Sequence, residues 1–131
     1  MTLAIDRFDH IVLNVKDVET SAAWYEQVLG MKREDFESRS GKRVSVKFGQ
    51  QKINLHVRGR EFEPKAHLPV PGALDLCFIA TVPLAQVIER LQAAAWPIIE
   101  GPVMRTGATQ KIRSVYVRDP DLNLIEISEL A

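Results

Sequence analysis

The sequence has little of several features that would point to a compartment or to a large partner. A single cysteine, Cys77, stands among 131 residues, so no internal disulfide can form and a reducing cytoplasm is expected. No apolar run approaches the roughly 18 residues of a membrane-spanning helix. The N-terminal stretch MTLAIDRFDH has no basic segment followed by an apolar block, so no export signal is expected.

An excess of charge of one sign is also lacking. Seventeen Lys and Arg residues balance seventeen Asp and Glu residues, so no global field favours nucleic acid or an anionic membrane. Hydrophobic residues make up 46% and charged residues 26%, as in ordinary globular proteins. The length of 131 residues is that of one domain. We therefore expect a single cytoplasmic domain over residues 1–131 that binds neither nucleic acid nor membrane.

What the sequence does contain is one order of elements that occurs twice. Alternating apolar residues predict strands, and apolar residues three to four positions apart predict helices. The first half is expected to form a strand, a helix and three strands, which span residues 8–15, 17–30, 31–38, 43–49 and 52–57. The second half repeats this order over residues 73–80, 83–95, 97–105, 112–118 and 123–129. This repetition is the strongest sign of how the chain is organised.

The predicted fold class is therefore α+β. Two β-α-β-β-β modules, residues 5–57 and 73–129, are joined by a connector over residues 58–72 that is rich in proline and charge. Side chains in a strand alternate between two faces, so each module has an aliphatic face for its helix and a more polar opposite face. We expect the strands to form a curved mixed sheet around a cavity, with the helices on the outside.

Polar residues stand at matching places in the two modules. His10 and Asp75 lie in the first strand of each module, Asn54 and His56 in the last strand of the first, and Glu126 in the last strand of the second. A carboxylate in an aliphatic strand is either solvated or buried with a compensating partner. Imidazole and carboxylate groups on rigid strands suit a divalent cation. No short ligand motif such as HExxH is present, so the solvated alternative stays open.

Two stretches resemble the vicinal oxygen chelate superfamily, namely FDHIVLNVKDVETSAAWYEQVLGMK and VRDPDLNLIEIS. This superfamily includes glyoxalase I, bleomycin-resistance proteins and extradiol dioxygenases, and the resemblance covers essentially the whole chain. Within it, the stretch around HVRGREFEPKAHLPVPGALDLCF looks closest to the subgroup called glyoxalase domain-containing protein 5. The resemblance implies one divalent metal ion in the sheet cavity, which holds two substrate oxygens. It also implies a homodimer whose sites are completed by both subunits.

The positions of the superfamily's metal ligands carry over only in part. His10 matches the histidine of the first strand, and Glu126 matches the glutamate of the last strand. Asp75 stands where a histidine is usual, and Asn54 stands where many glyoxalases have a glutamate. The resemblance therefore implies that His10, His56 and Glu126 bind one Zn, Ni, Mn or Fe ion.

The implied activity is that of a metal-dependent lyase or isomerase of the glyoxalase type. The metal would polarise a substrate oxygen, and Glu126 and Asp75 are the predicted catalytic residues, with Asp75 as a fourth ligand or base. Many substrates of the superfamily are anionic, and an arginine can clamp an acid group with two hydrogen bonds. The residues assigned to the small-molecule substrate are polar or basic: Arg113, Asn54, Arg105 and Lys111. The alternative interpretation of the basic residues is that they are solvated charges on a loop and bind no substrate.

Two other functions stay open. A metal-free pocket that binds a drug or metabolite, as in bleomycin-resistance proteins, would fit the departures at Asp75 and Asn54. The aromatic content of 7% disfavours a groove that stacks on a flat drug. An extradiol dioxygenase ranks third, because this chain has two modules where many such enzymes have four.

Overall fold

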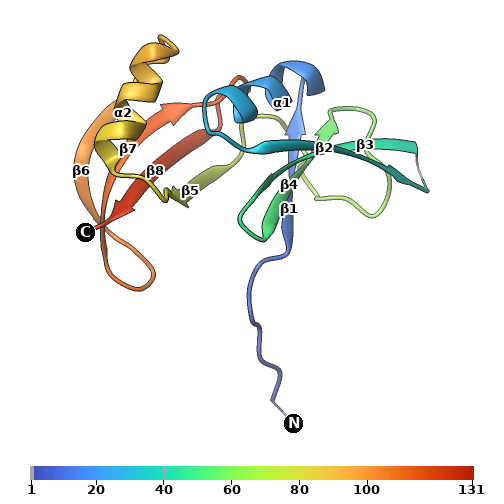
Figure 1. The fold of residues 1–131 in the computed structure, drawn as a ribbon. Coiled ribbons are helices and arrows are strands. Elements are labelled where there is room, and N and C mark those ends of the chain that lie inside the picture. Colours follow the sequence, from blue (N-terminus) through green and yellow to red (C-terminus); the bar gives the residue numbers. More distant parts are fainter. Residues whose placement is uncertain (1, 40) are drawn as a thin grey trace. The chain divides into compact units, whose positions relative to one another are not determined.

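The structure is a computed structural model that describes residues 2–39 and 41–131. The chain forms two compact units, Met1–Val70 (unit 1) and Pro71–Ala131 (unit 2), and the division falls inside the predicted connector. Each unit holds one four-stranded sheet and one helix (Figure 1), so the predicted α+β class with two β-α-β-β-β modules is confirmed. The strands belong to two separate four-stranded sheets. No helix in the described part of the chain is long and apolar enough to span a membrane.

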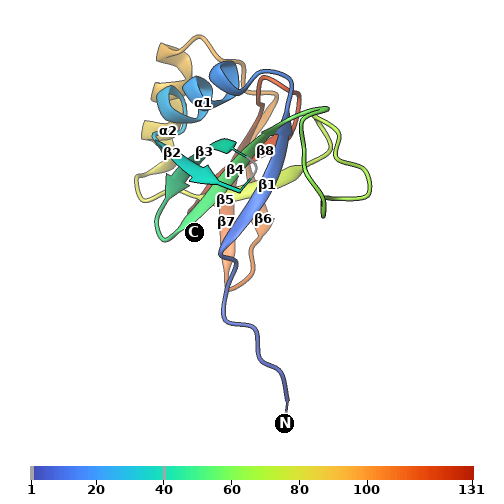
Figure 2. The ribbon, with the colours of Figure 1, turned by 90° about the vertical axis from the view of Figure 1, so that its right-hand side faces the viewer.

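Unit 1 follows the predicted order closely. Its elements are β1 (His10–Val15), α1 (Val18–Gln27), β2 (Lys32–Ser38), β3 (Gly41–Phe48) and β4 (Gln51–Val57). The strand order is β1-β4-β3-β2, with β1 parallel to β4 and the other pairs antiparallel. The first strand begins two residues later than predicted. The segment before it runs away from the sheet (Figure 1, Figure 2), and its Leu3, Ile5 and Phe8 are exposed.

The predicted aliphatic face of unit 1 forms its core. Helix α1 packs against β2, β3 and β4. The side chains buried between helix and sheet are apolar and include Leu13, Val15, Ala22, Tyr25, Val46, Ile53 and Leu55. Because side chains alternate along a strand, this packing leaves the opposite face of β1, β3 and β4 for the polar residues. That opposite face is called the polar face of unit 1.

Helix α1 begins and ends on local signals. The side chain of Asp17 accepts a hydrogen bond from the Thr20 backbone N–H at 3.1 Å, which confirms the predicted N-cap. The helix ends at Gln27, before the predicted Gly30, with Val28 as its C-cap residue. Gly30 has a φ of 71°, a left-handed conformation in which glycine has no steric penalty, and there the chain turns toward β2.

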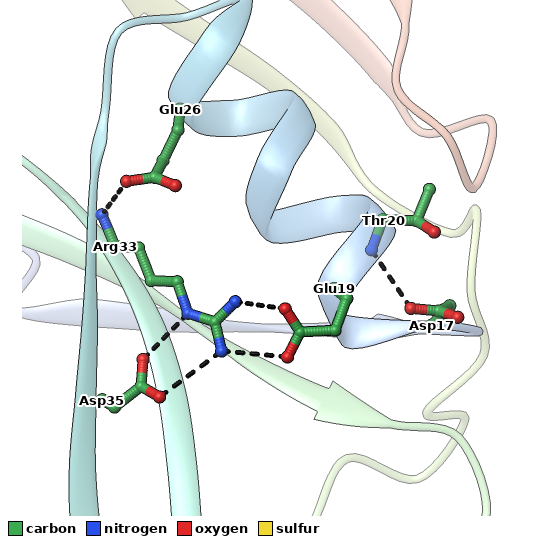
Figure 3. A network of polar contacts seen from close by, with 6 residues as sticks. All are labelled: Asp17, Glu19, Thr20, Glu26, Arg33 and Asp35. Atoms are coloured by element: carbon green, nitrogen blue, oxygen red, sulfur yellow. Dashed lines mark hydrogen bonds and ion pairs between the residues drawn. The ribbon is translucent and has the colours of Figure 1, made fainter.

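Arg33 fastens β2 to α1 (Figure 3). Its guanidinium donates to Glu19 at 2.5 and 3.0 Å and, through Nε, to Asp35 at 2.8 Å. The backbone N–H of Arg33 donates to Glu26 at 3.1 Å. These hydrogen bonds raise the pKa of Arg33 and lower the pKa of both Glu19 and Asp35. One side chain thus ties the first turn of the helix to the edge strand.

Unit 2 repeats the topology of unit 1. Its elements are β5 (Asp75–Ile79), α2 (Leu84–Ala93), β6 (Glu100–Thr106), β7 (Lys111–Arg118) and β8 (Leu124–Leu130). The strand order is β5-β8-β7-β6, with β5 parallel to β8. The predicted strand at 97–105 begins later, and its register shifts between Glu100 and Val103. A Cβ on Gly101 would lie 2.4 Å from the Ser114 carbonyl oxygen, so only glycine fits this irregularity.

Helix α2 packs against β7 and β8. Its N-cap, Pro83, makes no side-chain capping hydrogen bond. Instead, Glu129 on β8 accepts a hydrogen bond from the Leu84 backbone N–H at 2.6 Å. The first turn of a helix attracts a carboxylate, so this contact stabilises α2 from the sheet. The apolar side chains buried in unit 2 are Leu84, Leu91, Ile112, Val115, Val117, Ile125 and Ile127.

The turn before β8 is held by a buried aspartate. Asp119 is 1% exposed, and its Oδ1 accepts hydrogen bonds from the backbone N–H groups of Asp121 and Asn123, both at 2.9 Å. Its Oδ2 accepts from the Asn123 side chain at 2.8 Å, and Asn123 in turn accepts from the Leu74 backbone N–H at 2.9 Å. The predicted turn thus also anchors the chain just before β5. Leu122 completes it with a φ of 72°.

Candidate functional site

Unit 2 contains a cavity on the polar face of its sheet, opposite α2. Its volume is about 410 Å³. The cavity is lined by residues of β5, β6, β7 and β8 and of the loop between β6 and β7: Cys77, Ile79, Arg105, Thr106, Gly107, Ala108, Thr109, Gln110, Ile112, Glu126 and Leu130. Aliphatic and uncharged polar residues, together with one carboxylate and one guanidinium, suit a small organic molecule that carries a few polar groups.

The carboxylate of Glu126 is held by a chain of buried hydroxyl groups. Ser114 Oγ donates to Glu126 Oε2 at 2.6 Å and lies 2.6 Å from Ser128 Oγ. Ser128 Oγ lies 3.5 Å from the sulfur of Cys77. Both serines are fully buried. Burial raises the pKa of the Cys77 thiol, and the hydrogen bond with Ser128 opposes this effect.

Arg105 is fixed at the other side of the cavity. Its Nε donates to the Tyr116 hydroxyl at 3.0 Å, and Nη2 lies 3.4 Å from Glu100 Oε1. The hydrogen bond to Tyr116 and the charge of Glu100 raise the pKa of Arg105. Burial raises the pKa of Tyr116, the charge of Glu126 adds to this shift, and Arg105 opposes it. Tyr116 is the partner of Glu126 in the β7–β8 register, so it lies between the carboxylate and the guanidinium.

The other predicted residues of unit 2 fall outside the cavity lining. Asp75 is exposed on the polar face, two residues before Cys77, at the start of β5. Arg113 is the register partner of Glu129 on the neighbouring strand. Because side chains alternate along a strand, both residues lie on the face opposite to Glu126. Lys111 shares that face, and its ammonium donates to Thr106 at 3.0 Å. Of the four predicted substrate-binding residues, only Arg105 lines the cavity.

The predicted residues of unit 1 lie on its polar face. His10 Nδ1 is 2.8 Å from the exposed carboxylate of Asp9, and this contact lowers the pKa of Asp9. The His10 backbone pairs with Lys52, whereas His56 pairs with Asn14. His10 and His56 are therefore offset by four residues along neighbouring strands, roughly 13 Å.

His56 lies in an aromatic and basic cluster. Its ring centroid is 5.6 Å from that of Phe62, and the Arg43 guanidinium lies 4.3 Å from the same phenyl ring. Burial lowers the pKa of His56, the charge of Arg43 acts in the same direction, and the charge of Glu61 opposes it. Glu61 accepts from the Asn14 side chain at 3.2 Å. The start of the connector is thus fastened over the polar face of unit 1.

Asn54 is the unit 1 residue that matches Glu126. If His10 and Asp75 are taken as equivalent first-strand positions, the strand registers of the two units make Asn54 the equivalent of Glu126. The Oδ1 atom of Asn54 is buried and has no hydrogen-bond partner among the described residues. An orphaned buried acceptor of this kind is the sort of atom that a cation or a ligand donor would satisfy.

The predicted metal ligands come from both units: His10 and His56 from unit 1, and Glu126 from unit 2. Within each unit, no three His, Cys, Asp or Glu side chains of the described residues gather closely enough to hold an ion. Sequence reasoning missed the serine pair and the Phe62 cluster. Ser128 could have been found from the sequence, because it follows Glu126 on the same face of one strand. Ser114 could not, because its spacing along the chain does not show which strand it pairs with.

Comparison with known proteins decides the family. Residues 7–127 match the model of the Glyoxalase/Bleomycin resistance protein/Dioxygenase superfamily. The chain belongs to this superfamily. The predicted resemblance is thereby confirmed at superfamily level, and the finer likeness to glyoxalase domain-containing protein 5 stays a prediction.

Proteins similar to this chain include a virulence protein and a solved structure from a mobile metagenome. Virulence protein STM3117 of Salmonella typhimurium is 51% identical over 97% of this chain and 86% of its own length. The VPC_CASS1 structure from the mobile metagenome of V. pseudocholerae is 48% identical, with a TM-score of 0.95 over 100% of this chain and 99% of its own.

Two more distant structures show the fold alone. Lactoylglutathione lyase from Agrobacterium tumefaciens is 23% identical, with a TM-score of 0.71 over 95% of this chain and 94% of its own. The antibiotic-binding protein TnmS3 from Streptomyces sp. CB03234 is 21% identical, with a TM-score of 0.75 over 99% of this chain and 100% of its own. The same fold is therefore found in a lyase and in a binding protein.

Proposed function

We propose that this chain is a cytoplasmic, metal-dependent enzyme of the glyoxalase type, which acts on a small molecule as a lyase or isomerase. The observation that supports the proposal is the position of Glu126 and its lack of an ion-pair partner. Its carboxylate lines the unit 2 cavity and takes part in none of the ion pairs found among the described residues. A half-buried carboxylate without a cationic partner favours a cation or a transferable proton beside it.

The proposed metal ligands are His10 and Glu126, with either His56 or Asp75 to complete the set; Asp75 is also a possible base. Their imidazole and carboxylate groups suit Zn, Ni, Mn or Fe, and the orphaned Oδ1 of Asn54 is a further donor of the kind a cation accepts. When bound, the metal would polarise a substrate oxygen and stabilise the anion that forms as a proton leaves. Oε1 of Glu126 or the carboxylate of Asp75 accepts that proton.

Arg105 is the residue proposed to hold the substrate. Its guanidinium is oriented by Tyr116 and Glu100 and lines the same cavity as Glu126. An oriented guanidinium can bind a carboxylate or phosphate with two hydrogen bonds. A substrate with an acid group at one end and a carbonyl or hydroxyl oxygen at the other would use both residues.

A homodimer is part of the proposal. In the arrangement that the superfamily resemblance implies, His10 of one copy shares a site with Glu126 of another. Mixing a His10→Ala chain with a Glu126→Gln chain would then restore one intact site per mixed dimer. Recovery of metal binding in the mixture, and in neither parent alone, is the expected result; no recovery would contradict the shared site.

Metal titration calorimetry on chelator-stripped protein tests the central proposal. Ni²⁺, Mn²⁺, Zn²⁺ and anaerobic Fe²⁺ are each titrated into the native chain and into Glu126→Gln. The substitution keeps the size of the side chain and an acceptor for Ser114 but removes the charge. We expect one ion per chain, with binding lost in the variant. Absence of binding to the native chain would overturn the metal-dependent function.

Matched variants sharpen this experiment. Glu100→Gln removes another carboxylate from the polar face of the same sheet and should leave metal binding unchanged, because Glu100 pairs with Arg105. Comparison of His56→Ala with Asp75→Asn decides which residue completes the ligand set. The four-residue offset between His10 and His56 makes this choice open.

A metal-free binding protein is the second candidate. The cavity lining favours it, because only two of its residues, Arg105 and Glu126, carry charge and the others are uncharged. A protein of this kind would bind small organic acids without any ion, and binding would depend on Arg105 but survive Glu126→Gln. An extradiol dioxygenase would instead consume oxygen with catechols in the presence of Fe²⁺.

A further inference from the structure

Two serines in the middle of unit 2 have no part in the function described so far. Ser114 on β7 and Ser128 on β8 are register partners, and both are fully buried. A buried hydroxyl is costly unless it is hydrogen-bonded, and here the two hydroxyls lie 2.6 Å apart, with Ser114 also 2.6 Å from Glu126 Oε2. The pair therefore forms a buried polar contact between β7 and β8.

The direction of these hydrogen bonds follows from counting protons. An ionised carboxylate only accepts, so Ser114 gives its single hydroxyl proton to Glu126. The contact between the serines then uses the proton of Ser128. The two hydroxyls therefore point in series toward Oε2 of Glu126.

We propose that Ser114 and Ser128 are positioning residues for Glu126. They hold Oε2 against the sheet and so fix the direction in which the carboxylate faces the cavity. This inference rests on the proposed function only for what the carboxylate binds; the positioning itself concerns the geometry of the chain. A carboxylate that is oriented before a ligand arrives loses less rotational freedom on binding it.

Unit 1 lacks this arrangement. Ser45 is the register partner of Asn54, the place that Tyr116 holds beside Glu126 in unit 2, and it is also fully buried. Its hydroxyl donates to the Glu34 backbone carbonyl at 3.3 Å, and the Oδ1 of Asn54 is left without a partner. A buried serine beside the last strand therefore does not by itself orient the side chain there. In unit 2 the hydrogen bond to Glu126 comes instead from Ser114, two residues along β7 from that register position.

Substitutions of the serines test the proposal. Ser114→Ala removes the donor, Ser114→Thr keeps it, and Ser128→Ala removes the support behind it. Ser45→Ala is the matched control, because it deletes an equally buried hydroxyl in unit 1. We expect Ser114→Ala to weaken binding of the metal identified by calorimetry about tenfold or more, and Ser128→Ala to weaken it less. Ser114→Thr and Ser45→Ala should bind as the native chain does.

A second measurement does not depend on metal binding. In protein labelled with ¹³C at the glutamate carboxyl, the Glu126 signal is identified by its absence in Glu126→Gln. We expect this signal to move in Ser114→Ala, to return in Ser114→Thr and to stay in place in Ser45→Ala. A signal that stays in place in folded Ser114→Ala would overturn the positioning role. If Ser114→Ala does not fold, Ser128→Ala decides in the same way.

The two measurements separate the two proposals. A native chain that binds no ion, with a Glu126 signal that moves in Ser114→Ala, would refute the metal-dependent function and keep the positioning role. If the native chain and Ser114→Ala bind an ion equally well and the Glu126 signal does not move, the positioning role is refuted and the metal-dependent function is kept.

Discussion

In unit 1 the polar face carries His56 and Arg43 around Phe62. In unit 2 the equivalent face carries the carboxylate of Glu126 beside two serine hydroxyls and the thiol of Cys77. The strand order is the same in both units, and each helix packs against the two central strands of its sheet. One face of each sheet is committed to the helix, because its aliphatic side chains form the core. The other face is not needed for the core, so its chemistry can differ between repeats without loss of the fold.

The two helices differ in the same sense. Helix α1 takes its N-cap from the adjacent Asp17, whereas α2 takes an equivalent contact from Glu129 on a distant strand. The two equivalent helices are therefore stabilised at their first turns by a local contact in unit 1 and by a long-range contact in unit 2. Substitutions at such contacts should therefore change stability by different amounts in the two units.

Asp119→Ala should cause the largest loss. The substitution leaves two buried backbone N–H groups and the Asn123 amide without their acceptor. We expect the free energy of unfolding to fall by about 3 kcal/mol. Urea unfolding followed by Trp96 fluorescence in a Trp24→Phe background reports on unit 2, because the Trp96 indole donates to the Arg118 carbonyl beside the turn. Retention of native stability would contradict the role of Asp119.

Removal of the two helix-capping carboxylates should have unequal effects. Glu129→Ala deletes a short, charge-assisted hydrogen bond at a helix that has no other side-chain cap, and we expect a loss of about 2 kcal/mol. Asp17→Ala deletes a single exposed cap, and we expect about 1 kcal/mol. Thermal and urea unfolding of both variants checks the order. Glu129→Gln, which keeps an acceptor, is the control and should lose less than Glu129→Ala.

Leu122→Gly should increase stability. Leu122 is 63% exposed and has a φ of 72°, so glycine would remove backbone strain and would cost little apolar burial. The gain should be about 0.5–1 kcal/mol, because the greater freedom of glycine in the unfolded chain offsets part of the relief. Leu68→Gly, at another exposed leucine without a positive φ, should bring no gain. An equal gain in both variants would rule out backbone strain as the cause.

His56 should give unit 1 a small dependence of stability on pH. Burial and Arg43 lower its pKa in the folded chain, while Glu61 opposes them and the His10 charge adds slightly. The unfolded chain therefore binds more protons once the pH falls through the ordinary value of 6.5, so stability declines on acidification below that pH. The decline levels off below the folded pKa. His56→Gln should flatten the curve between pH 7.5 and pH 5; an unchanged slope would assign it to other groups.

Much of the fold could be predicted from particular residues. The alternation of Ile11, Leu13 and Val15 predicts a strand with one buried face, and Asp17 predicts the start of the helix that covers it. The strand at 97–105 was predicted less well, because the irregularity at Gly101 depends on the close approach of the Ser114 carbonyl. The candidate site was predicted in part: Glu126 and Arg105 line the cavity, whereas Arg113 lies on the other face.

The sequence by itself determined the repeated order of elements, the aliphatic face of each sheet and the local caps and turns at Asp17 and Asp119. These features depend on side-chain periodicity and on contacts within a few residues. Only the tertiary structure decided that Ser114 lies beside Glu126, that Glu129 reaches the start of α2, and that Arg43 packs on Phe62. The physical reason is strand register: a shift of one residue moves every side chain to the other face, and spacing along the chain does not fix it.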